Sequence, residues 1–227
     1  SFALEAQVNT NNITIVRDKY GVPHIYGITD KEAAYGLAWA HAEDDFSTIQ
    51  KTFLPAKGLL GRYQGINGAV LDYAVELLRC REVAKREMKN LPQEGLQVIE
   101  GYLEGLNAYA KKYPKKILVK NSFPLSTHDY LTGLNLMLHL FSDTDDVLGQ
   151  LLGNNIEPIQ DLNGVDNIGG GIGSNAFAFN SNKTLDGKTY LNVNTHQPLE
   201  GPFSWYEAHV NSEDGWNMLG GLFPGLP

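Results

Sequence analysis

The residue whose type and position best suit a chemical reaction is Ser174, which follows a glycine-rich run that ends at Gly173. Its hydroxyl could attack the carbonyl of its own preceding peptide bond, giving an N-to-O acyl shift that water would then hydrolyse. Such a shift needs a strained backbone, and a glycine before the serine has no Cβ to obstruct it. After cleavage, Ser174 would carry both a hydroxyl nucleophile and an α-amine, whose unperturbed pKa of about 8 suits a general base. Gly173-Ser174 is therefore a candidate self-cleavage site.

The same segment has simpler interpretations. Glycine-rich runs before Ser-Asn commonly form linkers or turns. A phosphate-binding loop is a weaker alternative, because the run lacks the lysine of G-x-x-x-x-G-K-[ST] and no helical pattern follows it. The rest of the chain must therefore decide between a linker and a cleavage site.

Composition sets the broad class. The chain has 227 residues, of which 42% are hydrophobic and 19% are charged, so it can bury a sizeable core. A net charge of −8 and the lack of a basic stripe argue against a nucleic-acid partner. The single cysteine, Cys80, excludes an intrachain disulfide and a thiolate metal cluster. No apolar run of membrane-spanning length occurs, so membrane insertion is not expected.

Most elements expected before Ser174 are helices. A strand, a glycine turn and a second strand are predicted over 13–26. A helix then begins with Thr29 or Asp30 as its N-cap, two long amphipathic helices are predicted over 71–91 and 93–113, and another begins at Ser126 and runs to about 141. These helices would position the glycine-rich segment that precedes Ser174.

The pattern changes to strands after Ser174. Strands are predicted over 174–179, 189–193 and 205–210, with Asp186-Gly187 as a hairpin signal in the first connection. The sequence thus indicates an α+β chain, with a mainly helical front part and a sheet that starts at the candidate cleavage point.

Four motifs in order along the chain resemble the penicillin acylase family of N-terminal nucleophile hydrolases. The first covers Arg17–Ile25 and Ala34–Asp44, the second Gly173–Ala178, the third Asn194–His196 with Trp205–His209, and the fourth Gly220–Pro227. The resemblance implies an αββα sandwich. Residues 1–150 would be a helical α-subunit region, 151–173 a spacer ending at the cleavage site, and 174–227 the start of a β-subunit.

The resemblance also implies an activity and site residues. The expected reaction is hydrolysis of an amide to release an acyl group from an amine, with Ser174 as the nucleophile and His196 beside it as a second catalytic residue. Met137 and Phe141 are expected to line the acyl pocket, which leucine at position 140, in place of an arginine of the penicillin G type, would make more apolar. A periplasmic or secreted location follows from the resemblance, with any signal peptide outside this numbering.

No cofactor is expected for the chemistry, but a structural calcium is a possible ligand. Asp146 matches the place of an acidic ligand in some family members, and carboxylate oxygens suit a hard cation. Two departures, Asp45-Phe46 and Thr195, occur where the family often has other residues, and they leave the subfamily open.

Family β-subunits are much longer than the part that follows Ser174 here. The chain is therefore expected to be an inactive fragment whose main partner is the remainder of its own β-subunit, beside a small acyl-amide substrate. A non-catalytic exported protein that binds acyl ligands on the same fold is the alternative. A metal-dependent hydrolase using His24, His41 and 43–45 has little support, because no H-E-x-x-H or comparable spacing is present.

Overall fold

A four-stranded sheet joins the two ends of the chain. The computed structural model describes residues 8–141, 147, 149–150, 153 and 173–227. Its main sheet has the order β1 (Thr14–Arg17), β2 (Pro23–Gly27), β5 (Tyr206–Ser212) and β6 (Asn217–Leu222). The central pair β2–β5 is parallel and both outer pairs are antiparallel. The N-terminal hairpin and the strand predicted over 205–210 are confirmed, whereas the sequence patterns do not predict β6.

Helix α1 (Asp30–Phe53) packs against β2 and β5. Thr29 is its N-cap, and a capping box links the Thr29 side chain and Glu32 in both directions. Asp45 has non-helical dihedral angles (φ −146°, ψ 60°), and its side chain accepts a hydrogen bond from the Thr48 backbone at 3.1 Å. Asp45 therefore ends one helical segment and caps the next, which bends the helix.

Helix α5 (Gln93–Lys112) crosses α1 at close range through small residues. A Cβ placed on Gly105 would lie 2.5 Å from the Tyr35 carbonyl oxygen and 2.9 Å from the Ala38 Cβ, and one on Gly101 would overlap the Lys31 carbonyl oxygen. The core around this crossing contains Ile25, Phe53, Tyr102, Leu106 and Tyr109. Glycine at these two positions therefore sets the distance between the helices.

The remaining helices are α2 (Leu60–Gln64), α3 (Ile66–Leu77), α4 (Cys80–Glu87) and α6 (Thr127–Leu140), with short 3₁₀ turns between some of them. The single helix predicted over 71–91 is wrong, because Arg79 adopts a left-handed conformation (φ 56°) that separates α3 from α4. The break lets α4 turn to pack on α6. The predicted start of α6 is confirmed, since Ser126 and Asp129 form a capping box.

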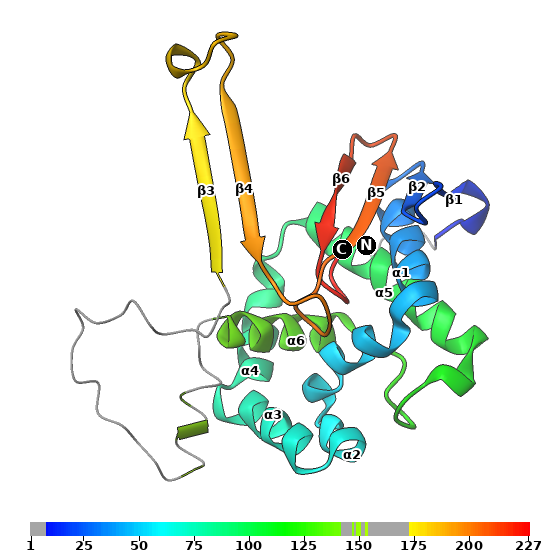
Figure 1. Ribbon diagram of the computed structural model, residues 1–227. Coiled ribbons are helices and arrows are strands. Elements are labelled where there is room, and N and C mark those ends of the chain that lie inside the picture. The colour runs from blue at the N-terminus through cyan, green and yellow to red at the C-terminus, as the bar shows by residue number, and fades with distance from the viewer. Residues whose placement is uncertain (1–7, 142–146, 148, 151–152, 154–172) are drawn as a thin grey trace.

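A second sheet consists of β3 (Gly173–Phe179) and β4 (Tyr190–His196), paired antiparallel from Gly173↔His196 to Phe179↔Tyr190. This hairpin projects from the body of the molecule (Figure 1). Apolar side chains occur on both of its faces, since Phe177 and Leu191 are 56% and 70% exposed and alternation places them on opposite faces. The predicted hairpin is confirmed, and helix and sheet together confirm the α+β class.

Tyr206 on β5 connects three segments that are distant in sequence. Its hydroxyl donates a hydrogen bond of 2.6 Å to the Asp44 carboxylate. The same carboxylate accepts a hydrogen bond of 2.8 Å from the Arg17 guanidinium. The Tyr206 ring stacks on that of His41, with centroids 3.9 Å apart. Burial and the Asp44 carboxylate raise the pKa of Tyr206, so the hydroxyl stays a donor. Burial lowers the pKa of His41 to about 4, although the Asp45 and Asp44 carboxylates oppose that shift.

The helix crossing gives the first prediction. Replacing Gly105 with alanine forces a methyl group into the α1 backbone, so we expect a loss of about 1–3 kcal/mol in the free energy of unfolding, measured by denaturant titration. Gly95, also in α5, has open space where a Cβ would lie, with no atom within 4 Å. The matched control Gly95→Ala should be neutral or stabilising by up to about 1 kcal/mol. Equal stability of the two variants would contradict the close crossing.

The buried imidazole gives a pH prediction. His41 is neutral in the folded state down to about pH 4, whereas an unfolded histidine takes up its proton near about pH 6.5. The unfolded state therefore binds more protons in this window, and stability should fall by up to about 3 kcal/mol as the pH drops from 6.5 to 4. Unfolding free energies of the wild type and of His41→Phe, which keeps a stacking ring, measure this contribution. An unchanged pH slope in the variant would show that His41 is not its source.

Candidate active site

Ser174 is the second residue of β3 and lies directly opposite Thr195 on β4. Gly173, on the acyl side of the predicted scissile bond, lies opposite His196. Because neighbouring residues on a strand alternate between faces, Ser174 shares a face of the hairpin with Thr195. The two residues of the predicted cleavage site thus lie at the base of the hairpin, where it joins the body.

His196 occupies the other face of the hairpin base. Its Nε2 lies 3.2 Å from the side-chain nitrogen of Asn175, which neighbours Ser174. The register brings the backbone of His196, rather than its ring, towards the Gly173-Ser174 segment. The predicted catalytic role of His196 stays a prediction, and this geometry favours its backbone over its ring as the contact.

Met137 and Phe141 lie one turn apart at the end of α6, near the segment that follows β4. Met137 is buried and lines a pocket of about 140 Å³, together with Leu136, Leu140 and Phe203. Phe141 packs edge-to-face on Phe203 with centroids 4.7 Å apart. The walls of this pocket are mainly apolar, with Lys51 and Thr52 among the lining residues. A role in substrate binding stays a prediction for both residues.

Phe141 belongs to an aromatic cluster with Phe203, Trp205 and Phe223. The Trp205 ring stacks on Phe223 with centroids 4.3 Å apart, and Phe223 is 5.3 Å from Phe141. The Thr52 hydroxyl of α1 donates to the Pro224 carbonyl at 3.1 Å, next to Phe223. The cluster therefore brings together α6, the segment before β5 and the segment after β6.

The cluster is linked to the strand that faces Ser174. The Trp205 indole N–H donates to the Thr195 hydroxyl at 3.0 Å, and Thr195 is the cross-strand partner of Ser174. The sequence patterns did not single out Phe203, Trp205 and Phe223 as site residues. The signal that could have indicated them is the density of aromatic residues just before β5 and just after β6.

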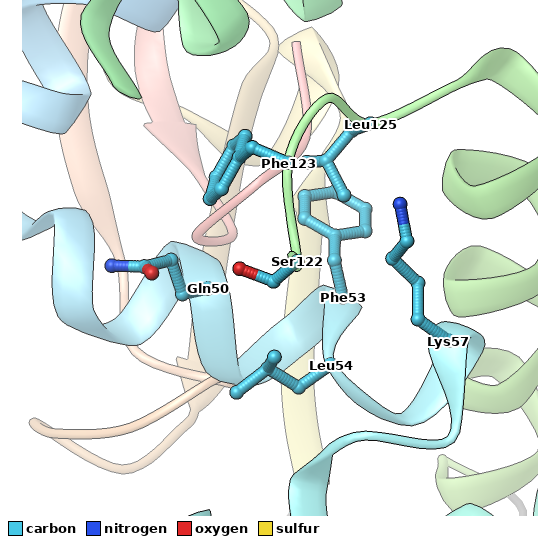
Figure 2. A pocket seen from close by; sticks show the side chains of 7 residues that line it. All are labelled: Gln50, Phe53, Leu54, Lys57, Ser122, Phe123 and Leu125. Atoms are coloured by element: carbon cyan, nitrogen blue, oxygen red, sulfur yellow. The ribbon is translucent and has the colours of Figure 1, made fainter. Parts of the chain in front are cut away.

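Another cavity lies beside the second half of α1, and it is too small for a substrate. Its volume is about 10 Å³, the size that one water molecule needs. Figure 2 shows the side chains that enclose it: Gln50, Phe53, Leu54, Lys57, Ser122, Phe123 and Leu125. The Gln50 amide is already bonded to the backbone of Phe46, Lys116 and Leu118. This cavity is a packing feature of the core.

Candidate metal ligands do not gather in the part of the chain that the structure describes. Within it, no group of three or more histidine, cysteine or acidic side chains is arranged to hold a metal. Asp44 is bonded to Arg17 and Tyr206, His41 is buried in a stack, and His24 contacts His209 at 3.0 Å. The metal-dependent hydrolase alternative has no support from these residues.

Two expectations fall outside the described residues. Asp146 lies there, so the structure offers no donor set on which to test calcium binding, which stays a prediction. Most of the spacer predicted over 151–173 also lies outside them. Among the helices that the structure describes, none combines the length and apolar character needed to cross a bilayer.

A family model and several known proteins match this chain. The penicillin amidase family model matches residues 12–227. The acyl-homoserine lactone acylase PvdQ of Pseudomonas savastanoi pv. phaseolicola is 26% identical over 94% of this chain and 31% of its own length. Penicillin G acylase of Escherichia coli is 25% identical over 51% of this chain and 14% of its own.

A solved structure is also similar. Thermostable penicillin G acylase from Alcaligenes faecalis aligns with a TM-score of 0.46 and 19% identity, over 66% of this chain and 94% of that one. The chain spans 31% of the length of the first of these acylases, so it corresponds to a part of such a protein. The family match covers the hairpin base, the end of α6 and the aromatic cluster. Because it extends over most of the chain, the chain belongs to the penicillin amidase family.

Proposed function

We propose that the protein is an autoprocessing acylase that hydrolyses an amide bond, with Ser174 as its N-terminal nucleophile. The observation that carries the proposal is the position of Gly173-Ser174 at the start of β3, beside a strand that is bonded to the aromatic cluster. The family match supports amide hydrolysis in general. The acylase names of the relatives support an acyl group as the part that is released.

The first reaction would be self-cleavage. The Ser174 hydroxyl attacks the Gly173 carbonyl, the C–N bond breaks, and an ester joins Gly173 to the serine oxygen. Water then hydrolyses the ester and leaves a carboxylate on Gly173 and a free α-amine on Ser174. Because Gly173 has no Cβ, its carbonyl is open to this attack.

Turnover would use the two groups that Ser174 then carries. The α-amine accepts the hydroxyl proton while the oxygen attacks the amide carbonyl of the substrate. The leaving amine takes up that proton, and an acyl ester remains on Ser174. Water attacks the ester, the acid leaves, and the serine hydroxyl is restored. Hydrogen-bond donors for the oxyanion are expected from the remainder of the β-subunit.

The substrate would be an amide with an apolar acyl group. The pocket beside Met137 has apolar walls of Leu136, Leu140 and Phe203, and Phe141 packs on Phe203 in the aromatic cluster. Burial of an acyl chain there would remove apolar surface from water and stabilise the complex. Acyl-homoserine lactones and penicillins, the substrates named for the relatives, both carry such an amide. A periplasmic or secreted location belongs to the same proposal.

Replacing Ser174 with alanine in the full-length protein tests the proposal. Intact mass and N-terminal sequencing should find a new terminus at Ser174 in the wild type and a single uncut chain in Ser174→Ala. Hydrolysis of an acyl-amide panel should fall by on the order of a thousandfold or more in the variant. Ser181→Ala, in the connection between β3 and β4, is the matched control and should behave as the wild type.

An unprocessed wild-type protein that binds acyl amides without hydrolysing them would overturn this proposal. That outcome would support the alternative of a non-catalytic acyl-binding protein on the same fold.

A further inference from the structure

The position of Ser174 relative to the pocket depends on how the β3–β4 hairpin is held. The hairpin projects from the body, and both of its faces carry exposed apolar side chains. The hydrogen bond from the Trp205 indole to the Thr195 hydroxyl joins β4 to the aromatic cluster at 3.0 Å. It acts at the base of the hairpin, opposite the candidate nucleophile.

Trp205 contacts two residues in and after β6. Its ring stacks on Phe223 at an interplanar angle of 16°. It also lies against Gly221 of β6, where a Cβ would approach the indole to 3.1 Å. Trp205 also directly precedes β5, the strand that pairs with β2. Trp205 is 44% exposed, and the contacts of its indole with Phe223 and Gly221 orient the N–H towards Thr195.

Thr195 transmits this position to Ser174. The two residues are cross-strand partners on one face of the hairpin, where directly opposed Cβ atoms lie about 4.5–5.5 Å apart. A shift of Thr195 therefore moves Ser174 with it, because the strands are joined by their backbone pairing. The helical wall of the pocket does not move with the hairpin, since Leu136, Met137 and Leu140 belong to α6.

We propose that Trp205 and Thr195 are positioning residues, which set the Ser174 hydroxyl at the correct distance from the acyl pocket. The inference rests on the proposed function of Ser174. Neither residue takes part in bond making, and both act through the strand that carries the nucleophile. A displacement of about 1 Å at a reacting atom can reduce a rate by about a hundredfold, and loss of one hydrogen bond alone corresponds to about fivefold.

Conservative variants of the full-length protein test this. Trp205→Phe keeps a stacking ring and removes the N–H, and Thr195→Val keeps the shape and removes the acceptor. We expect kcat, measured per cleaved molecule on an acyl-amide substrate, to fall about 5- to 100-fold in each. KM should change less than kcat, because neither Trp205 nor Thr195 lines the pocket. Thr195→Ser retains the hydroxyl and should restore most of the rate.

The double variant and a matched control separate positioning from general damage. The kcat of the double variant Trp205→Phe with Thr195→Val should fall no further than that of the worse single variant, because both substitutions remove the same hydrogen bond. Trp39→Phe removes a comparable indole hydrogen bond, to Glu43 at 3.0 Å in the same helix, and should leave kcat unchanged. The rate of Ser174 labelling by phenylmethylsulfonyl fluoride, followed by mass, should fall in parallel with kcat.

The outcomes distinguish the two proposals. If Ser174→Ala is inactive and unlabelled while Trp205→Phe and Thr195→Val keep wild-type kcat and labelling rates, the positioning role is wrong and the nucleophile stands. If Ser174→Ala retains hydrolysis, or the wild type is neither cut nor labelled at Ser174, both proposals fail. Additive losses in the double variant would also overturn the positioning role.

Discussion

The parallel pairing of β2 with β5 is the constraint on which the rest of the structure depends. It joins residues 24–27 to residues 209–212, and all the helices from α1 to α6 lie between these strands in the sequence. Ile25 of β2 is fully buried and Val210 of β5 almost fully. Parallel strands need a long crossover connection, and here that connection contains both the helical layer and the β3–β4 hairpin. The helical layer and the hairpin are therefore both enclosed between two strands that pair with each other.

The elements that local sequence determines could be predicted. Thr29 and Ser126 mark helix starts because their side chains accept from the backbone three residues later. Pro114 follows the last turn of α5, where a helix cannot easily continue. Arg79 could not be foreseen as a break, because arginine is a good helix former and its left-handed conformation accompanies the tertiary packing of α4 on α6. Strand β6 was missed because its Gly220-Gly221 pair is unfavourable for a strand by itself.

The candidate site divides in the same way. Ser174 and its preceding glycine could be identified because the chemistry depends on neighbouring residues in the sequence. The aromatic cluster could not, since Phe141, Phe203 and Phe223 meet only through contacts between distant segments. The spacing of Met137 and Phe141 predicted a shared helix face but not their different surroundings, one in a pocket and the other in the cluster. The bond between Trp205 and Thr195 likewise depends on the tertiary structure.

The main sheet contains strands from both sides of the predicted cleavage site, and this affects how many molecules unfolding produces. Cutting the chain between Gly173 and Ser174 would leave β1 and β2 on one polypeptide and β5 and β6 on the other, still paired side by side. Unfolding of the uncut chain yields one molecule from one, whereas unfolding of the cut form yields two. The midpoint temperature for unfolding of the cut form would then rise with protein concentration, and refolding would slow on dilution because the two pieces must first meet. Processing would thus convert an ordinary folding equilibrium into an assembly equilibrium.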